Sequence, residues 1–147
     1  MAHADDLPHE LSAYLRKDPL AVHLGIEIEE IRPGYARARM IVRAETLNAL
    51  GVAHGGATMS LADTVFAAAS NSHGRQALAI DLHTEFLSAG ALGEVLVGVA
   101  EELHLTRRMA VYRVSVVAES DGRRVAEVLA RVYRRDDPLP GAEVGSS

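Results

Sequence analysis

Cysteine and tryptophan are absent from the 147 residues of this chain, and only 4% of its residues are aromatic. Without cysteine, the chain can form neither a disulfide framework nor a thiolate zinc site, and it has no cysteine nucleophile. This composition fits a cytoplasmic protein. No stretch holds 18 consecutive apolar residues and no signal-peptide pattern is present, so we expect neither a membrane span nor secretion.

Positive charge is also scarce. The 15 Lys and Arg residues are outnumbered by 20 Asp and Glu residues, which gives a net charge of −5. An acidic chain lacks the broad basic surface that binds nucleic acid, so we expect no nucleic-acid partner. An anionic ligand must then be bound by a local basic cluster. The hydrophobic share of 48% is enough for the core of a single domain.

Hydrophobic patterns divide the chain into three parts. Residues 1–19 include a short amphipathic helix over 7–17 that we expect to cover the core, and residues 136–147 lack any pattern and are expected to form a disordered tail. The main domain, 20–135, shows strand patterns over 25–31 and 35–43, a largely buried helix over 55–71, and a four-strand meander over 76–88, 94–105, 109–119 and 123–135. The simplest packing is an α+β fold in which an antiparallel sheet wraps around the single helix.

The most informative segment is 48–74, NALGVAHGGATMSLADTVFAAASNSHG. Its helix begins on Gly55-Gly56 and carries a lone carboxylate, Asp63, among apolar residues. A helix N-terminus offers unpaired N–H groups and a positive dipole end, and glycine lets a ligand approach them. An anion-stabilising helix end together with a carboxylate in an apolar setting predicts an active site.

Five residues of this segment carry a family resemblance: Asn48, His54, Gly55, Gly56 and Asp63. Their spacing, supported by the motifs at 60–64 and 71–74, resembles that of the PaaI-type acyl-CoA thioesterases of the hotdog fold over residues 20–135. The resemblance implies hydrolysis of an acyl-CoA substrate, without a metal or bound cofactor. It favours aromatic acyl groups of the phenylacetyl kind, as in phenylacetate degradation, while medium-chain fatty acyl groups stay open.

The chemistry of thioester hydrolysis suggests a role for each residue. Negative charge develops on the carbonyl oxygen, and the Gly55 N–H is the candidate donor that stabilises it. Asp63 acts as general base on water or attacks the carbonyl directly, and the sequence does not choose between these roles. The resemblance implies that Asn48 orients the carbonyl or the water, that His54 holds the loop or the thioester, and that Gly56 contributes to substrate binding.

Two further groups are candidates for binding. Related thioesterases carry a hydroxyl on the strand after the helix, but the corresponding residue here is Ala79, so Thr64 or a backbone group is expected to position the water. Arg107 and Arg108 are the best local candidates for the phosphates of coenzyme A, because adjacent guanidinium groups bind phosphate oxygens in pairs. An ordinary exposed turn is the competing interpretation of this arginine pair.

The positions of Gly55 and Asp63 predict an oligomer. They are eight residues apart, which is about 12 Å along one helix at a rise of 1.5 Å per residue. One carboxylate therefore cannot serve its own helix end, and Asp63 must come from a second protomer whose helix runs roughly antiparallel. A homodimer with two composite sites follows, and the resemblance implies the same arrangement, often with dimers paired into a homotetramer.

Two other functional classes remain open. One is a non-catalytic acyl-CoA-binding regulatory module, and the other is a hotdog-fold enoyl hydratase or dehydratase in which His54 and Asp63 act as acid and base, although the Pro-Gly motifs of that branch are absent. Purely structural roles for the glycine pair, His54 and Asp63 compete with each of these functional interpretations, including the thioesterase. A metal site at His83 is rejected, because alternating polar residues on a strand are typical of a solvated face. Ser60 lacks the G-x-S-x-G elbow of a hydrolase nucleophile.

Overall fold

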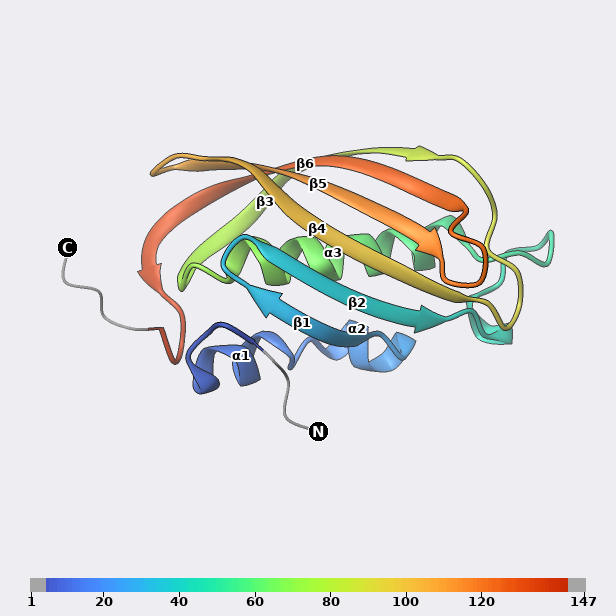
Figure 1. Cartoon of the computed structure of the whole chain (residues 1–147), viewed down its shortest axis with the longest axis horizontal. Helices are drawn as coiled ribbons and strands as arrows, with labels where there is room; N and C mark the ends of the chain where they lie inside the picture. Colours follow the sequence, from blue (N-terminus) through green and yellow to red (C-terminus); the bar gives the residue numbers. More distant parts are fainter. Residues whose placement is uncertain (1–4, 143–147) are drawn as a thin grey trace.

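The computed structural model describes residues 5–142, which form one six-stranded antiparallel sheet with a long helix against it. The elements follow one another as α1 (His9–Leu15), α2 (Pro19–Leu24), β1 (Glu27–Arg32), β2 (Tyr35–Ile41), a 3₁₀ turn (Ala44–Thr46), α3 (Gly55–Asn71), β3 (Arg75–Phe86), β4 (Val95–Leu105), β5 (Met109–Ala118) and β6 (Arg124–Pro138). The sheet curves over α3, and α1 and α2 lie near the side of α3 that the sheet leaves uncovered (Figure 1). This architecture confirms the predicted α+β hotdog fold. Within the described range, no helix is long and apolar enough to cross a membrane.

Alternating apolar residues form the core between the sheet and α3. In β2, Ala36, Ala38 and Met40 are each 0% exposed. In β6 the alternate residues are buried in the same way: Ala126, Val128, Ala130 and Val132. Small residues let the layers approach, since a Cβ atom at Gly98 of β4 would lie 3.1 Å from the Leu61 side chain of α3. The period-2 pattern thus predicted these buried faces correctly.

The strand order differs from the predicted four-strand meander. The order is β1-β2-β4-β5-β6-β3, so β3 pairs with β6 and β4 pairs with β2. Only β4, β5 and β6 form a meander. An alternating pattern identifies a strand and its buried face, but it carries no information about which strand lies beside it. The consequence is that β3 forms one edge of the sheet.

The N-terminal cover is longer than predicted. Pro19 ends the first helical segment, as expected, but it also begins α2, because proline is tolerated at the first position of a helix. Asp18 caps this helix by accepting a hydrogen bond of 3.1 Å from the Ala21 N–H, and Gly25 ends it with a left-handed φ of 72°. The helical cover therefore extends to Leu24, and the first strand begins at Glu27.

The first part of the predicted disordered tail, 136–147, is ordered, because β6 extends into it. This strand continues to Pro138, and Leu139 is only 8% exposed. The Leu139 N–H donates a 2.9 Å hydrogen bond to the Gly74 carbonyl, which fixes the segment beside the C-terminal end of α3. Burial of a single apolar side chain leaves no periodic signal in a sequence. Residues 143–147 of the predicted tail lie outside the described residues.

Most of the central helix is buried. Ten of its 17 residues are buried, which agrees with the prediction of a largely buried helix. Gly56, Asp63 and Ala67 are exposed, and their spacing places them on one face of α3. We call these three residues the α3 stripe. The chain therefore buries its core helix but leaves uncovered the face that carries the carboxylate.

Candidate active site

The loop before α3 ends on His54, which caps the helix. Its Nδ1 accepts a hydrogen bond of 2.8 Å from the Gly56 N–H. An accepting Nδ1 carries no proton, so the neutral ring has its N–H at Nε2. The His54 backbone N–H also donates to the Thr46 carbonyl at 2.7 Å, which holds the loop on the 3₁₀ turn. This geometry fits the loop-holding role suggested for His54.

The two glycines at the helix start act differently. The Gly56 N–H is used by His54, so it is not available to a substrate, and the predicted binding role of Gly56 becomes a steric one. A Cβ atom at Gly56 would lie 3.1 Å from His54 Nδ1, so a residue without a side chain makes room for the capping ring. The Gly55 N–H donates no hydrogen bond to any residue from 5 to 142. Gly55 therefore presents the free donor that the sequence predicts.

Asn48 shapes the loop and keeps one end of its amide free. Its Oδ1 accepts hydrogen bonds from the N–H groups of Leu50 at 2.9 Å and Val52 at 3.3 Å. Two backbone donors fix the orientation of the amide, so its NH₂ group points away from the loop backbone. Within the described part of the chain, this NH₂ group has no hydrogen-bond acceptor. Asn48 can therefore donate to a carbonyl oxygen.

Asn48 and Gly55 line one pocket of about 310 Å³. Phe86, at the end of β3, forms part of its wall together with the segment that follows, 87–90. A Cβ atom at Gly55 would lie 3.4 Å from the Phe86 ring, so the ring approaches the helix start closely. Sequence reasoning missed Phe86, because the pairing of β3 with β6 that brings it here is not encoded locally. Asn48 and Gly55, the two residues predicted to donate hydrogen bonds to the carbonyl oxygen, therefore line the same largely apolar cavity.

Asp63 lies on the α3 stripe, away from this pocket. The residue is exposed in the single chain, yet neighbouring atoms partly desolvate its carboxylate. This desolvation raises the pKa of Asp63, and the negative charge of Asp18 adds to the rise. A raised pKa makes the carboxylate a stronger base. Because α3 is one continuous helix, Asp63 lies about 12 Å from Gly55 along its axis.

The hydroxyl groups closest to Asp63 in sequence bond back to the helix. Thr64 Oγ1 donates to the Ser60 carbonyl at 2.7 Å, and Ser60 Oγ donates to the Gly56 carbonyl at 2.8 Å. Thr64 is only 7% exposed. These contacts do not favour the predicted role of Thr64 in positioning water.

A strand hydroxyl does approach this part of α3, but from an unpredicted residue. Thr84 Oγ1 of β3 lies 3.1 Å from Met59 Sδ, about one helical turn before Asp63. Ala79 is exposed further back on β3 and carries no hydroxyl. Thr84 is therefore a further candidate for a hydroxyl near the carboxylate.

Arg107 and Arg108 lie at the β4–β5 turn, where a third arginine joins them. Asp136 pairs with Arg108 at 2.8 Å, with Arg75 at 3.2 Å and with Arg107 at 3.7 Å. The hydrogen bond from Arg108 holds the pKa of Asp136 below its usual range. One carboxylate cannot neutralise three guanidinium groups, so this arginine cluster (Arg75, Arg107 and Arg108) keeps excess positive charge. Positive charge is therefore concentrated at this turn.

The single chain does not bring all predicted site residues together. Asn48, His54 and Gly55 meet at the start of α3, whereas the arginine cluster lies beside the start of β3, which follows the other end of α3. Asp63 lies between these two ends. The structure thus separates the pocket lined by Asn48 and Gly55 from the carboxylate of Asp63.

The side chains around His83 are arranged for an ion pair. Asp81 pairs with Arg131 of β6, and this pairing lowers the pKa of Asp81. His83 is exposed on the same strand. Among residues 5–142, no group of three or more His, Asp or Glu side chains could hold a metal ion.

Comparisons with known proteins agree with the fold. A family model described as the thioesterase superfamily matches residues 50–125. The acyl-coenzyme A thioesterase PaaI of Escherichia coli (strain K12) is 38% identical over 105 residues, which cover 71% of this chain and 75% of that protein.

Solved structures extend the match over more of the chain. The structure of the E. coli PaaI protein from the phenylacetic acid degradation operon superposes with a TM-score of 0.84 and 33% identity, covering 90% of this chain and 99% of that one. A hypothetical thioesterase protein from Streptococcus pneumoniae TIGR4, solved with coenzyme A, gives a TM-score of 0.73 and 27% identity over 78% of this chain and 88% of its own.

Proposed function

Because this chain belongs to the thioesterase superfamily and is a hotdog thioesterase of the PaaI type, we propose that it hydrolyses acyl-coenzyme A thioesters to a free acid and coenzyme A. One observation carries the proposal: the unbonded Gly55 N–H, within residues 5–142, opens into a pocket that it shares with the Asn48 amide. Such donors stabilise the oxyanion of acyl transfer, and one donor accounts for about 100- to 1,000-fold in rate.

The proposed step begins with the thioester carbonyl oxygen bound by the Gly55 N–H and the Asn48 NH₂ group. Asp63 takes a proton from water, and the water oxygen attacks the carbonyl carbon. The carbon–sulfur bond then breaks, and the departing thiolate receives the proton from Asp63. A second route, in which the Asp63 carboxylate itself attacks to form an anhydride that water hydrolyses, uses the same geometry. Single-turnover hydrolysis in ¹⁸O-labelled water distinguishes them, because label in the Asp63 carboxylate identifies the second route.

The proposed site is shared between two protomers. The separation of about 12 Å along α3 prevents Asp63 from reaching a carbonyl bound at its own Gly55. The edge strand β3 supports a dimer, because its outer edge is unpaired within residues 5–142 and its large side chains Leu78, Ile80 and Phe86 are 54%, 49% and 56% exposed. Pairing of two β3 strands would set two α3 stripes side by side, with the helices antiparallel.

The proposed ligand contacts extend to the coenzyme A phosphates and the acyl group. The arginine cluster supplies the local positive charge that an acidic chain otherwise lacks, and its guanidinium groups suit phosphate oxygens. The similarity to a protein of the phenylacetic acid degradation operon supports an aromatic acyl group of the phenylacetyl kind.

A thiol-release assay on a panel of acyl-CoA esters tests the proposal. The wild type should release coenzyme A, and Asp63→Asn should lose at least about 100-fold in kcat, because a positioned general base contributes 100- to 10,000-fold. Asp6→Asn is the matched control, since Asp6 is an exposed carboxylate outside the site and its loss should leave kcat unchanged. Near-normal turnover by Asp63→Asn would refute the proposed mechanism.

A further inference from the structure

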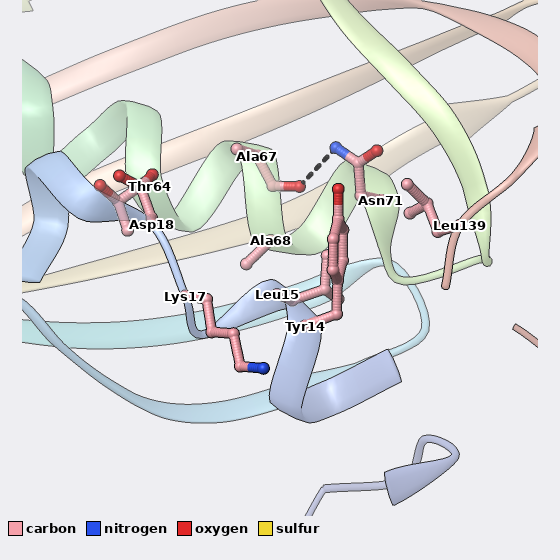
Figure 2. Close-up of a pocket in the computed structure, with 9 residues that line it drawn as sticks. All are labelled: Tyr14, Leu15, Lys17, Asp18, Thr64, Ala67, Ala68, Asn71 and Leu139. Carbon is pink, nitrogen blue, oxygen red and sulfur yellow. Dashed lines mark hydrogen bonds between the residues drawn. The ribbon is translucent and has the colours of Figure 1, made fainter. Parts of the chain in front are cut away.

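A pocket of about 360 Å³ lies between α1 and the second half of α3 (Figure 2). Tyr14 and Leu15 of α1 form one wall, Ala67 and Ala68 of α3 form the other, and Leu139 closes the end beyond β6. We call this cavity the α1–α3 pocket. Its volume lies within the range of small-molecule binding sites.

The α1–α3 pocket begins beside the carboxylate of the proposed site. Thr64, which follows Asp63 in α3, lines it, and so does Ala67, the next residue of the α3 stripe. Asp18 also lines the pocket, and its charge acts on the Asp63 carboxylate. A group attached to a carbonyl at Asp63 can therefore enter this pocket directly, along the small side chain of Ala67.

Three polar side chains of the pocket, on Asp18, Thr64 and Asn71, already hydrogen-bond to the chain itself. Thr64 Oγ1 donates to the Ser60 carbonyl, and Asp18 Oδ1 accepts from the Ala21 N–H. The amide of Asn71 donates to the Ala67 carbonyl at 2.9 Å, drawn as a dashed line in Figure 2, and accepts from the Ala77 N–H at 2.9 Å.

This hydrogen bonding distinguishes between the two halves of an acyl-CoA substrate. The pantetheine arm of coenzyme A contains two amides, and burying them without hydrogen-bond partners is costly. An aryl or alkyl group needs no such partners. The remaining polar atoms of the pocket are the Tyr14 hydroxyl, the Lys17 ammonium group and the second carboxylate oxygen of Asp18. Tyr14 and Lys17 are exposed residues that water can reach. The pocket therefore suits the apolar half of the substrate.

We propose that the α1–α3 pocket binds the acyl group of the thioester and that the Tyr14 ring limits its size. This inference rests on the proposed thioesterase function. The pocket follows α3 from Thr64 to Asn71, which is about 10 Å at 1.5 Å per residue, enough for a phenylacetyl or medium-chain group. Figure 2 shows the Tyr14 ring standing against α3 with its hydroxyl directed toward Asn71, so the ring stands across the path of a longer group.

Two substitutions with opposite effects on pocket size test this inference. Tyr14→Ala opens the pocket and should raise kcat/KM for decanoyl relative to acetyl thioesters by about tenfold, since each methylene in an apolar pocket is worth about ten- to 200-fold. Ala67→Leu fills the pocket and should lower the same ratio. Tyr14→Phe keeps the ring and should restore the wild-type ratio. Val22→Ala is the matched control on α2, because Val22 is 68% exposed and does not line the pocket.

A comparison of two thiol carriers shows whether the acyl group or the coenzyme A arm occupies the pocket. Each acyl group is offered both as a coenzyme A ester and as an N-acetylcysteamine ester, which lacks most of the coenzyme A arm. The inference predicts equal shifts in the acyl ratio for both series. A change in KM for coenzyme A esters alone would place the coenzyme A arm in the pocket and overturn it, as would an unchanged ratio in a folded, active Tyr14→Ala variant. An inactive wild type would instead refute the proposed function itself.

Discussion

The contact between His54 and Gly56 leads to a prediction about coupled stability at the start of α3. Loss of a helix cap costs about 1 kcal/mol, so His54→Ala should destabilise the protein by that amount and lower Tm by about 2–4 °C. Gly56→Ala gains up to about 1 kcal/mol of helix propensity. The new methyl group would also lie 3.1 Å from His54 Nδ1 and displace the capping ring. The gain in helix propensity and the loss of the cap should therefore nearly cancel in the stability of Gly56→Ala.

The double variant separates these two effects. With the ring already removed, Gly56→Ala should stabilise the protein by about 0.5–1 kcal/mol, which gives a coupling energy near 1 kcal/mol. Urea unfolding of the four proteins at one protein concentration measures this cycle. In the thiol-release assay, the double variant should be no slower than His54→Ala, because both changes act through the same cap. Additivity within about 0.5 kcal/mol would refute the reasoning.

Three other outcomes follow from the contacts described. Replacing Arg107 and Arg108 by Ala should raise KM for coenzyme A esters with little change in kcat, while KM for N-acetylcysteamine esters stays constant; an equal rise for both would remove the pair from the phosphate site. Asp18→Asn removes a charge that raises the pKa of Asp63, so the acid limb of the pH–rate profile, where the base becomes protonated, should move to lower pH. Asparagine still caps α2, and an unmoved limb would argue against Asp63 as the titrating group. Leu139→Ala should cost about 2–3 kcal/mol in urea unfolding if this residue is part of the core, against less than about 0.5 kcal/mol if the segment is a tail.

Local signals explain which parts of the fold the sequence could predict. The helix Gly55–Asn71 begins and ends where the sequence places it, because a glycine pair follows a capping residue and a glycine comes shortly after the last turn. The alternation in β2 and β6 identified their buried faces, since each depends only on residues within one strand.

Contacts between distant parts of the chain explain what the sequence did not predict. The position of β3 at the sheet edge depends on β6, about 50 residues later in the chain. The same long-range pairing brings Phe86 to the helix start, Thr84 to Met59 and Arg75 to the β4–β5 turn. None of these contacts has a periodic or motif signal in the sequence.

The different roles of Gly55 and Gly56 at the start of α3 could be assigned only from the hydrogen bonds in the structure. Both glycines were predicted to meet the substrate, but the His54 ring accepts the Gly56 N–H and leaves only that of Gly55 free, within the described residues. A sequence motif identifies a helix end, but it does not show which N–H groups the chain itself uses.

Subunit complementation tests the central claim, that one active site combines groups from two protomers. Asp63→Asn retains the Gly55 and Asn48 donors, and Asn48→Ala retains the carboxylate, so each homodimer should be nearly inactive. Mixed by unfolding and refolding, the two variants should recover about a quarter of wild-type kcat, since half of random dimers are heterodimers with one intact site each. A mixture no more active than its components would contradict the account.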